Sequence, residues 1–189
     1  FQRLSFVGEL GWEIFIPKKI SNRFFNIINK IGKKYNLGYS GMHTLDILRL
    51  EKKFLHWGHD ITSENNPIEA GLSFAVNLKK KENFIGREAV EKMINKQPKK
   101  KLQLFSLKKN FKPGKPLLLH DEPIFYKDKI VGNTTSSNYS FYYKKNLSLG
   151  YLDTGFETED LSLEVEGEQY SLKLENQALH DPALKSLRN

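Results

Sequence analysis

The segment Ser5-Phe-Val-Gly-Glu-Leu-Gly-Trp-Glu-Ile-Phe-Ile-Pro17 organises the beginning of this sequence. Gly8 and Gly11 bracket only two residues, which indicates a tight turn where the backbone needs positive φ or approaches another group closely. The alternating apolar run after the turn has the composition of a strand, and Pro17 ends it because proline lacks a ladder donor. We therefore expect strands over residues 3–7 and 12–16, joined by this turn.

Within the second of these strands, Glu13 points to the opposite face from Trp12 and Ile14, because strand side chains alternate. A carboxylate there must face water or a polar ligand, since burying it without a partner is costly. From the residues alone, a solvent-facing glutamate in a half-buried hairpin is the simpler interpretation. A ligand contact is the alternative.

The composition is that of a globular protein. The chain has 189 residues, 39% hydrophobic and 28% charged, enough for one or two domains with a core. The absence of cysteine excludes disulfides, iron–sulfur ligation, a cysteine nucleophile and thiolate zinc sites. No apolar stretch reaches the ~20 residues that a membrane span needs, and we expect no signal peptide before the first strand. We expect a cytoplasmic protein, or a mitochondrial matrix protein in a eukaryote, with no membrane partner.

Helical patterns occupy most of the rest of the first half. Residues 18–35 carry apolar side chains at three- and four-residue spacing, so we expect an amphipathic helix whose stripe is core, with Ser21 as a possible cap. Shorter helices are expected from Thr44 to Phe54, with Thr44 as cap, and from residue 84 to Ile94. Taken alone, Arg49 and Glu51 form a solvated pair that contributes little. His43, His56 and His59 lack a convincing metal-binding pattern and are predicted to be surface or supporting residues.

A shift in composition at Pro98-Lys-Lys-Lys101 marks a domain boundary. Beyond it, short alternating runs separated by turn signals predict a small antiparallel barrel or sandwich. The fold class is therefore α+β, with residues 1–97 as one domain and residues 98–189 as a second, all-β domain. The expected strands are residues 102–107, 122–126, 130–135, 147–152, 161–165 and 170–174.

Ordered blocks of sequence resemble the glycine-cleavage T-protein (aminomethyltransferase) superfamily, and most of all the C-terminal folate-binding region of sarcosine and dimethylglycine dehydrogenases. The resemblance extends over nearly the whole chain. The blocks are Gly8-Glu-Leu-Gly-Trp-Glu13, Leu48-Arg-Leu-Glu-Lys52, Trp57-Gly-His-Asp60, Asn66-Pro-Ile-Glu-Ala-Gly-Leu72, Phe84-Ile-Gly-Arg-Glu-Ala-Val90, Val131-Gly-Asn-Thr-Thr-Ser-Ser-Asn-Tyr-Ser140, Leu147-Ser-Leu-Gly-Tyr-Leu152 and Leu179-His-Asp-Pro182.

The resemblance implies the end of a folate-binding domain followed by a C-terminal β-barrel, with tetrahydrofolate as cofactor. In that family the glutamate matched by Glu13 hydrogen-bonds the pterin ring, which presents two adjacent donors that one carboxylate can accept. Phe6 and Trp12 would support the ring, and Arg49 and Trp57 are further cofactor-binding positions. The implied reaction passes a methylene unit from a methylated amine to tetrahydrofolate. FAD is expected only in an N-terminal part that we expect to be absent here.

Two positions depart from the aminomethyltransferase pattern. Phe6 stands where the family has an aromatic ring with a hydroxyl, so a hydrogen bond is lost while stacking remains. Leu45 stands where the family has an arginine, which favours the dehydrogenase branch over plain glycine cleavage. The family's aspartate beside the reacting nitrogen falls in the half that is missing. We therefore nominate no catalytic residue, and we expect this piece alone to be inactive.

Other functions stay open beside this interpretation. The nearest is a free-standing aminomethyltransferase or a folate-dependent demethylase. Proteins of another class are a non-enzymatic folate-binding regulator and a basic barrel that binds nucleic acid. The net charge of +8 favours an anionic partner, but the lysine runs of the chain lack the interleaved arginines and aromatic residues typical of nucleic-acid binding. The polyglutamate tail of a cellular folate is a more specific anionic partner than nucleic acid.

Overall fold

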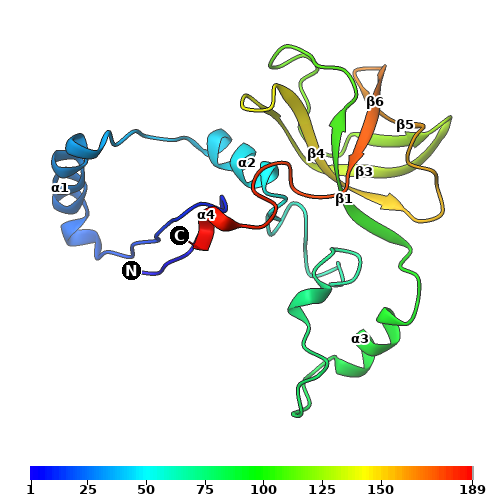
Figure 1. Cartoon of the computed structure of the whole chain (residues 1–189), viewed down its shortest axis with the longest axis horizontal. Coiled ribbons are helices and arrows are strands. Elements are labelled where there is room, and N and C mark those ends of the chain that lie inside the picture. The colour runs from blue at the N-terminus through cyan, green and yellow to red at the C-terminus, as the bar shows by residue number, and fades with distance from the viewer. Residues whose placement is uncertain (189) are drawn as a thin grey trace.

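The structure is a computed structural model in which residues 1–188 are described. Figure 1 shows a β-barrel at one end of an elongated molecule and helix α1 at the other. Helix α2 (Met42–Glu51) lies between them against the barrel, and the C-terminal tail with α4 (Lys185–Arg188) returns to the N-terminal segment. The beginning and the end of the chain therefore meet beside α2, outside the barrel.

The helices of the first half agree with the expected pattern. Helix α1 (Ser21–Gly32) is framed by single turns of 3₁₀ helix, η1 (Lys18–Ile20) and η2 (Lys33–Tyr35), so helical backbone covers the expected residues 18–35. Helix α2 begins after Gly41 rather than at Thr44. Residues Ser73–Ala75 form η3, and α3 spans Arg87–Ile94 after Gly86. Ser21 is the first residue of α1 and not its cap; its hydroxyl donates to the carbonyl oxygen of Lys18.

The strands expected over residues 3–7 and 12–16 are not formed. Gln2 and Glu13 exchange two backbone hydrogen bonds of 2.9 Å, and this single bridge is the only ladder contact of the segment among residues 1–188. The backbone of residues 14–16 does not extend this ladder, because no neighbouring strand in the described chain offers it hydrogen-bond partners. The hairpin is real, but it is closed at one point only.

The second half forms the predicted barrel. All six expected strands are present and every pair of neighbours is antiparallel, in the closed order β1-β4-β3-β2-β5-β6. Closure by pairing of β1 with β6 leaves no exposed sheet edge. The strands are β1 (Lys100–Leu107), β2 (Pro123–Tyr126), β3 (Lys129–Ser140), β4 (Lys145–Asp153), β5 (Leu161–Val165) and β6 (Glu168–Glu175).

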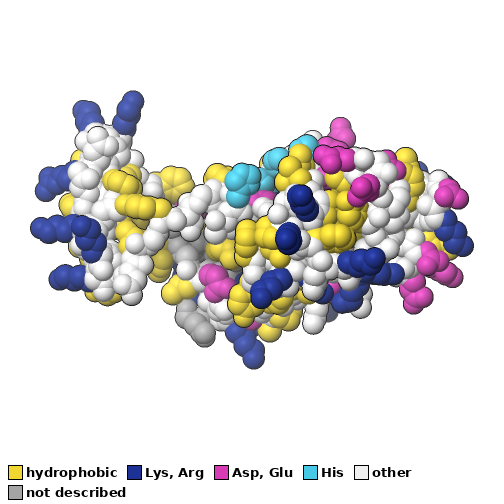
Figure 2. All heavy atoms as spheres, turned by 90° about the horizontal axis from the view of Figure 1, so that it is seen from above, with side chains coloured by type: hydrophobic (Ala, Val, Ile, Leu, Met, Phe, Trp, Pro, Cys, Tyr) yellow, Lys and Arg dark blue, Asp and Glu magenta, His cyan; other side chains and the backbone are white. Residues whose placement is uncertain are grey.

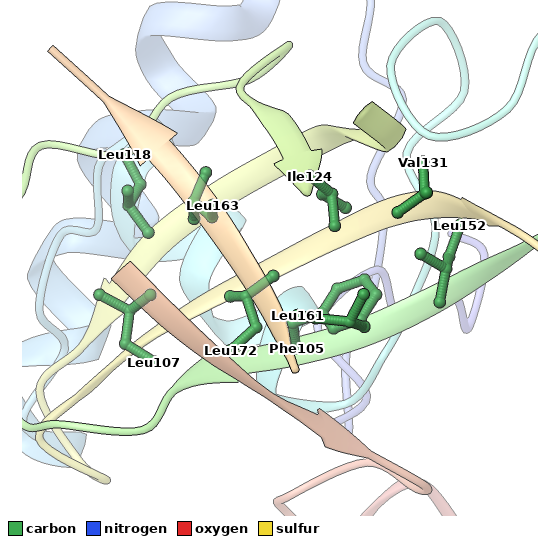
Figure 3. Close-up of a cluster of buried hydrophobic side chains, with 9 residues drawn as sticks. All are labelled: Phe105, Leu107, Leu118, Ile124, Val131, Leu152, Leu161, Leu163 and Leu172. Atoms are coloured by element: carbon green, nitrogen blue, oxygen red, sulfur yellow. The ribbon is translucent and has the colours of Figure 1, made fainter. Parts of the chain in front are cut away.

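Strand alternation gives the barrel two hydrophobic clusters. Phe105 points into the barrel, where it packs with residues from the other strands and with Leu118 (Figure 3). Its neighbour Leu104 points outward and joins a second cluster with Leu50 of α2. Because successive residues face opposite sides of a strand, one sheet both fills its own interior and binds α2. This outer cluster fixes the helix that carries the candidate site.

The apolar stripe of α1 is not core in the part of the chain that the structure describes. No residue of α1 is buried, and Phe25 is 56% exposed. The expectation of a core stripe is wrong for residues 1–188, because α1 projects away from the barrel and packs only against neighbouring parts of the chain, η1, η2 and the segment of residues 37–39 (Figure 1).

Candidate functional site

The turn at Gly8 and Gly11 needs both glycines. Gly8 has a φ of +71°, and a Cβ atom built on it would lie 2.8 Å from Cγ of Lys52. At Gly11 a Cβ atom would lie 2.9 Å from the carbonyl oxygen of Leu4. Positive φ and close approach, the two conditions that favour glycine, are therefore both met in this turn.

Lys52 is a buried cation that this turn encloses. Its side chain is 1% exposed, and Nζ donates to the carbonyl oxygen of Gly8 at 2.9 Å. The same nitrogen lies 3.0 Å from the Glu9 carboxylate and 3.3 Å from that of Asp181. A buried ammonium requires such partners, because desolvation alone would be costly. The N-terminal turn, the end of α2 and the C-terminal tail are therefore joined at one atom.

The carboxylates around Lys52 are held in their ionised form. The hydrogen bond from Lys52 is the main cause that lowers the pKa of Glu9 below its ordinary value, with a smaller contribution from His180. Backbone N–H groups of Lys185 and Ser186 lower the pKa of Asp181 well below its usual range, and Lys52 adds to this. Hydrogen bonds donated to a carboxylate stabilise its charged form. This junction is therefore strongest when both acids are deprotonated.

Arg49 is fully engaged inside the protein. Nε and Nη2 donate to Asp46 at 2.8 and 2.6 Å, Nη2 also donates to Ser136 at 2.6 Å, and Nη1 donates to Asp60 and to the carbonyl oxygen of Phe54. These bonds use all five N–H donors of a guanidinium, and the side chain is 1% exposed. The expectation of a solvated Arg49–Glu51 pair is wrong, because the two side chains take separate buried partners.

Asp60 and Glu51 connect the first half of the chain to strand β3. Asp60 accepts hydrogen bonds from the hydroxyl of Thr135 and from the backbone N–H of His56. Glu51 accepts from the hydroxyl of Ser140. Hydroxyl groups on β3 therefore donate hydrogen bonds to carboxylates of α2 and of the loop of residues 56–60. The bonds to Asp60 hold this loop in place.

Three histidines lie in contact along this loop and the loop before β2. The ring centroids of His56 and His59 are 4.5 Å apart, and those of His59 and His120 are 6.5 Å apart. Burial is the main cause that lowers the pKa of His56, and the charges of His59 and Arg49 add to it. With His43 these histidines line a cavity of about 310 Å³, and Figure 2 shows histidines grouped on the face between the α1 end and the barrel. No group of three or more potential ligands within residues 1–188 could hold a metal ion.

The loop of residues 56–60 brings three of the five predicted cofactor-binding residues together. Phe6 packs edge-on against His56 with ring centroids 5.4 Å apart, Arg49 holds Asp60, and Trp57 belongs to the loop and is 67% exposed. Phe6 also lines an apolar cavity of about 570 Å³.

The other two predicted residues lie at the opposite end of the hairpin, where Glu13 pairs with Gln2. Trp12 is 58% exposed. The carboxylate of Glu13 is exposed and has no hydrogen-bond or ion-pair partner among the described residues. This end of the hairpin therefore offers one free acceptor group beside one exposed ring.

Sequence reasoning did not single out Lys52, Asp60, Ser136 or Asp181. Each of these residues lies inside a block quoted above, at the end of Leu48-Arg-Leu-Glu-Lys52, of Trp57-Gly-His-Asp60, or within the β3 and C-terminal blocks. The blocks were visible in the sequence, but their convergence was not, because the contacts join residues up to 129 positions apart.

Comparisons with known proteins agree with the architecture. Residues 1–80 match the family model "GCVT N-terminal domain", and residues 100–181 match "Glycine cleavage T-protein C-terminal barrel domain". The fold is that of the glycine cleavage system aminomethyltransferase T from Bartonella henselae, with a TM-score of 0.80 at 23% identity over 95% of this chain and 49% of that chain.

Two curated relatives show similar identity to the chain. Dimethylglycine dehydrogenase from Mus musculus is 33% identical over 98% of this chain and 21% of its own length. The pyruvate dehydrogenase phosphatase regulatory subunit from Mus musculus is 32% identical over 79% of this chain and 17% of its own length. The chain thus spans about a fifth of the length of these two relatives.

Proposed function

The chain belongs to the glycine cleavage T-protein family, and from that premise we propose that it is the tetrahydrofolate-binding part of a one-carbon-transfer enzyme. The enzyme passes a methylene unit from a methylated amine, of the sarcosine or dimethylglycine type, to tetrahydrofolate. Its dehydrogenase relative supports this branch over plain glycine cleavage, as does Leu45, which replaces the family's arginine.

Glu13 carries the proposal. Its carboxylate is exposed on a fixed hairpin and has no partner within residues 1–188. The pterin ring of tetrahydrofolate presents an N–H and an amino group side by side, and one carboxylate accepts both hydrogen bonds. Two charge-assisted bonds fix the ring in its plane as well as binding it.

Aromatic side chains complete the proposed cradle. Trp12 adjoins Glu13, whereas Phe6 contacts His56 toward the other end of the hairpin and Trp57 is an exposed residue of the loop of residues 56–60. Trp12 can therefore stack on the ring that Glu13 holds, and Phe6 and Trp57 can stack on a flat part of the ligand farther from it. Arg49 has no free donor, so we assign it a positioning role: it holds the loop that carries His56 and Trp57.

The contribution of these residues to the reaction is orientation. Tetrahydrofolate supplies the two nitrogens that accept the one-carbon unit, and a pterin fixed at one edge presents those nitrogens in a defined direction. Holding two reactants in a productive geometry lowers the entropic cost of their encounter. In the dehydrogenase branch, a flavin domain elsewhere in the protein would oxidise the amine.

The test is folate binding by the intact protein with Glu13→Gln. An amide accepts hydrogen bonds at one oxygen and carries no charge, so affinity for 5-formyltetrahydrofolate should fall by roughly tenfold or more in calorimetry. Glu82→Gln, at an exposed surface position, is the matched control and should bind normally. Equal affinity of Glu13→Gln and the control would contradict the proposal.

The regulatory relative favours a second candidate, a folate-binding regulator without transfer activity. The two candidates are separated in the intact protein, assayed with any flavin domain it carries and with an electron acceptor that takes the two electrons of the amine oxidation. The measurement is transfer of an isotope-labelled methyl carbon from dimethylglycine to tetrahydrofolate. Labelled methylenetetrahydrofolate supports the enzyme. Tight folate binding with no labelled product supports the regulator.

The net charge of +8 supports a polyglutamylated folate as the form that binds. Attraction between lysines and a polyanionic tail is screened by salt. Affinity for pentaglutamyl folate should therefore fall more steeply with added salt than affinity for the monoglutamate. If the affinities for the two folates fell equally with added salt, binding of the polyglutamate tail by the lysines would be contradicted.

A further inference from the structure

A third cavity, of about 420 Å³, lies on the face of α2 that looks toward the turn between β3 and β4. None of the residues proposed to contact folate lines this cavity; those residues are Phe6, Trp12, Glu13 and Trp57. Ile47 and Leu48 of α2 form its apolar floor. Its most distinctive wall consists of three aromatic rings, Tyr139, Phe141 and Tyr142.

Two of these rings lie in an exposed turn, where the packing of the barrel does not require an aromatic side chain. Strand β3 ends at Ser140 and β4 begins at Lys145, so Phe141 and Tyr142 lie in the connecting turn. They are 71% and 74% exposed. Exposed turns usually carry small polar residues, and neither hydrophobic core of the barrel includes these rings. Packing therefore does not account for them.

The rings are nevertheless held in defined orientations. Tyr139 and Phe141 contact each other edge-to-face, with centroids 5.2 Å apart and planes at 78°. Tyr142 makes the same kind of contact with His180, at 5.8 Å and 66°. An edge-to-face contact uses the edge of one ring, so its own face stays available to a ligand.

The charges beside the cavity have the sign opposite to that of the whole chain. Glu9 and Glu51 line it, and Lys52 is the one lysine or arginine among its lining residues. The Lys52 side chain is 1% exposed, and its ammonium binds Gly8, Glu9 and Asp181. The two lining carboxylates therefore outnumber the one lining ammonium. A locally negative, aromatic-walled cavity in a chain of net charge +8 favours a cationic ligand.

We propose that this cavity binds a methylated ammonium group. Such a cation sits over aromatic faces, which attract it through their quadrupole, and its methyl groups suit an apolar floor. A bare ammonium is more strongly hydrated and loses more on entering an apolar site. The site does not depend on folate binding or on the proposed reaction. Its ligand is either a free small amine or a methylated lysine side chain of another protein.

The first experiment separates charge from shape in the intact protein. Choline and 3,3-dimethylbutan-1-ol have nearly the same shape, but only choline carries a charge. Titrations followed by NMR should show saturable choline binding and at least threefold weaker binding of the neutral alcohol. Equal binding of the two compounds, or no saturable binding of choline, would overturn the proposal.

The second experiment places the cation at the named rings. Phe141→Leu and Tyr142→Leu remove an aromatic face and keep an apolar side chain; because both residues are exposed, the fold should be retained. Each should weaken choline binding roughly threefold or more. The control is Tyr35→Leu, an exposed ring on η2 away from this cavity. Unchanged choline affinity in both cavity variants would contradict the assignment.

Two further measurements identify the source of the ligand and keep the proposals apart. A trimethyllysine peptide that binds much more tightly than choline or dimethylglycine identifies a protein side chain, and the reverse order identifies a free amine. Affinity for 5-formyltetrahydrofolate should be unchanged in Tyr142→Leu. Absence of choline binding would therefore not contradict the folate proposal. Equal folate affinity of Glu13→Gln and its control would not contradict the cation site.

Discussion

The ammonium nitrogen of Lys52 lies 3.3 Å from the carboxylate of Asp181, which is 129 residues further along the chain. The same ammonium binds the carbonyl oxygen of Gly8 and the Glu9 carboxylate. This junction joins three segments that share no strand or helix. It holds the glycine turn, and with it the hairpin that carries Glu13, against the end of α2.

Lys52→Met should destabilise the chain by roughly 1–2 kcal/mol, because the buried ammonium loses its hydrogen bond to the carbonyl oxygen of Gly8 and its ion pairs with Glu9 and Asp181. Urea unfolding followed by circular dichroism measures the change. Lys34→Met, at an exposed position of η2, should stay within about 0.5 kcal/mol of the wild type. Limited proteolysis should cut the C-terminal tail of the Lys52 variant first, and equal protection of the tail in both variants would contradict the junction.

Arg49→Lys keeps the charge but cannot satisfy the partners of a five-donor guanidinium. Because Asp46, Asp60 and Ser136 would lose buried hydrogen bonds, we expect a loss of about 3 kcal/mol in urea unfolding. Arg23→Lys on the exposed surface of α1 is the control and should change little. If both substitutions cost the same, the network around Arg49 does not stabilise the fold.

Gly8→Ala meets two obstacles, a φ of +71° and a Cβ position 2.8 Å from the Lys52 side chain. Together they should cost about 2 kcal/mol of unfolding free energy and weaken folate binding, since the hairpin carrying Glu13 shifts. Gly38→Ala is the contrasting case, because no atom lies within 4 Å of its Cβ position and its φ is not in the left-handed range. It should be neutral or slightly stabilising.

The pKa values of Glu9 and Asp181 are lowered in the folded protein, so both acids bind protons more weakly there than in the unfolded chain. Their contribution to stability is therefore complete above the ordinary values of 4.5 and 3.8 and is lost as the pH falls below them. Unfolding curves between pH 6 and pH 2 should show this decline, and Asp181→Asn should flatten it. A slope unchanged by the substitution would exclude Asp181 as a source.

The sequence predicted the parts of the fold that depend on local pattern. Alternating apolar residues after Pro98 identified all six strands, because a barrel strand must present one side chain in two to its interior. The spacing of Ile20, Phe24 and Ile27 identified the helical span of residues 18–35, because apolar residues three and four positions apart fall on one face of a helix. Local pattern failed for residues 3–7 and 12–16, since a strand also needs a neighbour, and within residues 1–188 this segment pairs only through Gln2 and Glu13.

The sequence by itself also determined the family, through motif blocks in a fixed order, and it marked Gly8, Phe6, Glu13 and Arg49 as residues to follow. Only the tertiary structure decided what surrounds them. Arg49 and Lys52 look like ordinary charged residues of a helix, and the fold buries both by bringing strand β3 and the C-terminal tail across α2. A charge is buried or solvated according to its neighbours in space, and those neighbours come from distant parts of the chain that no local pattern relates.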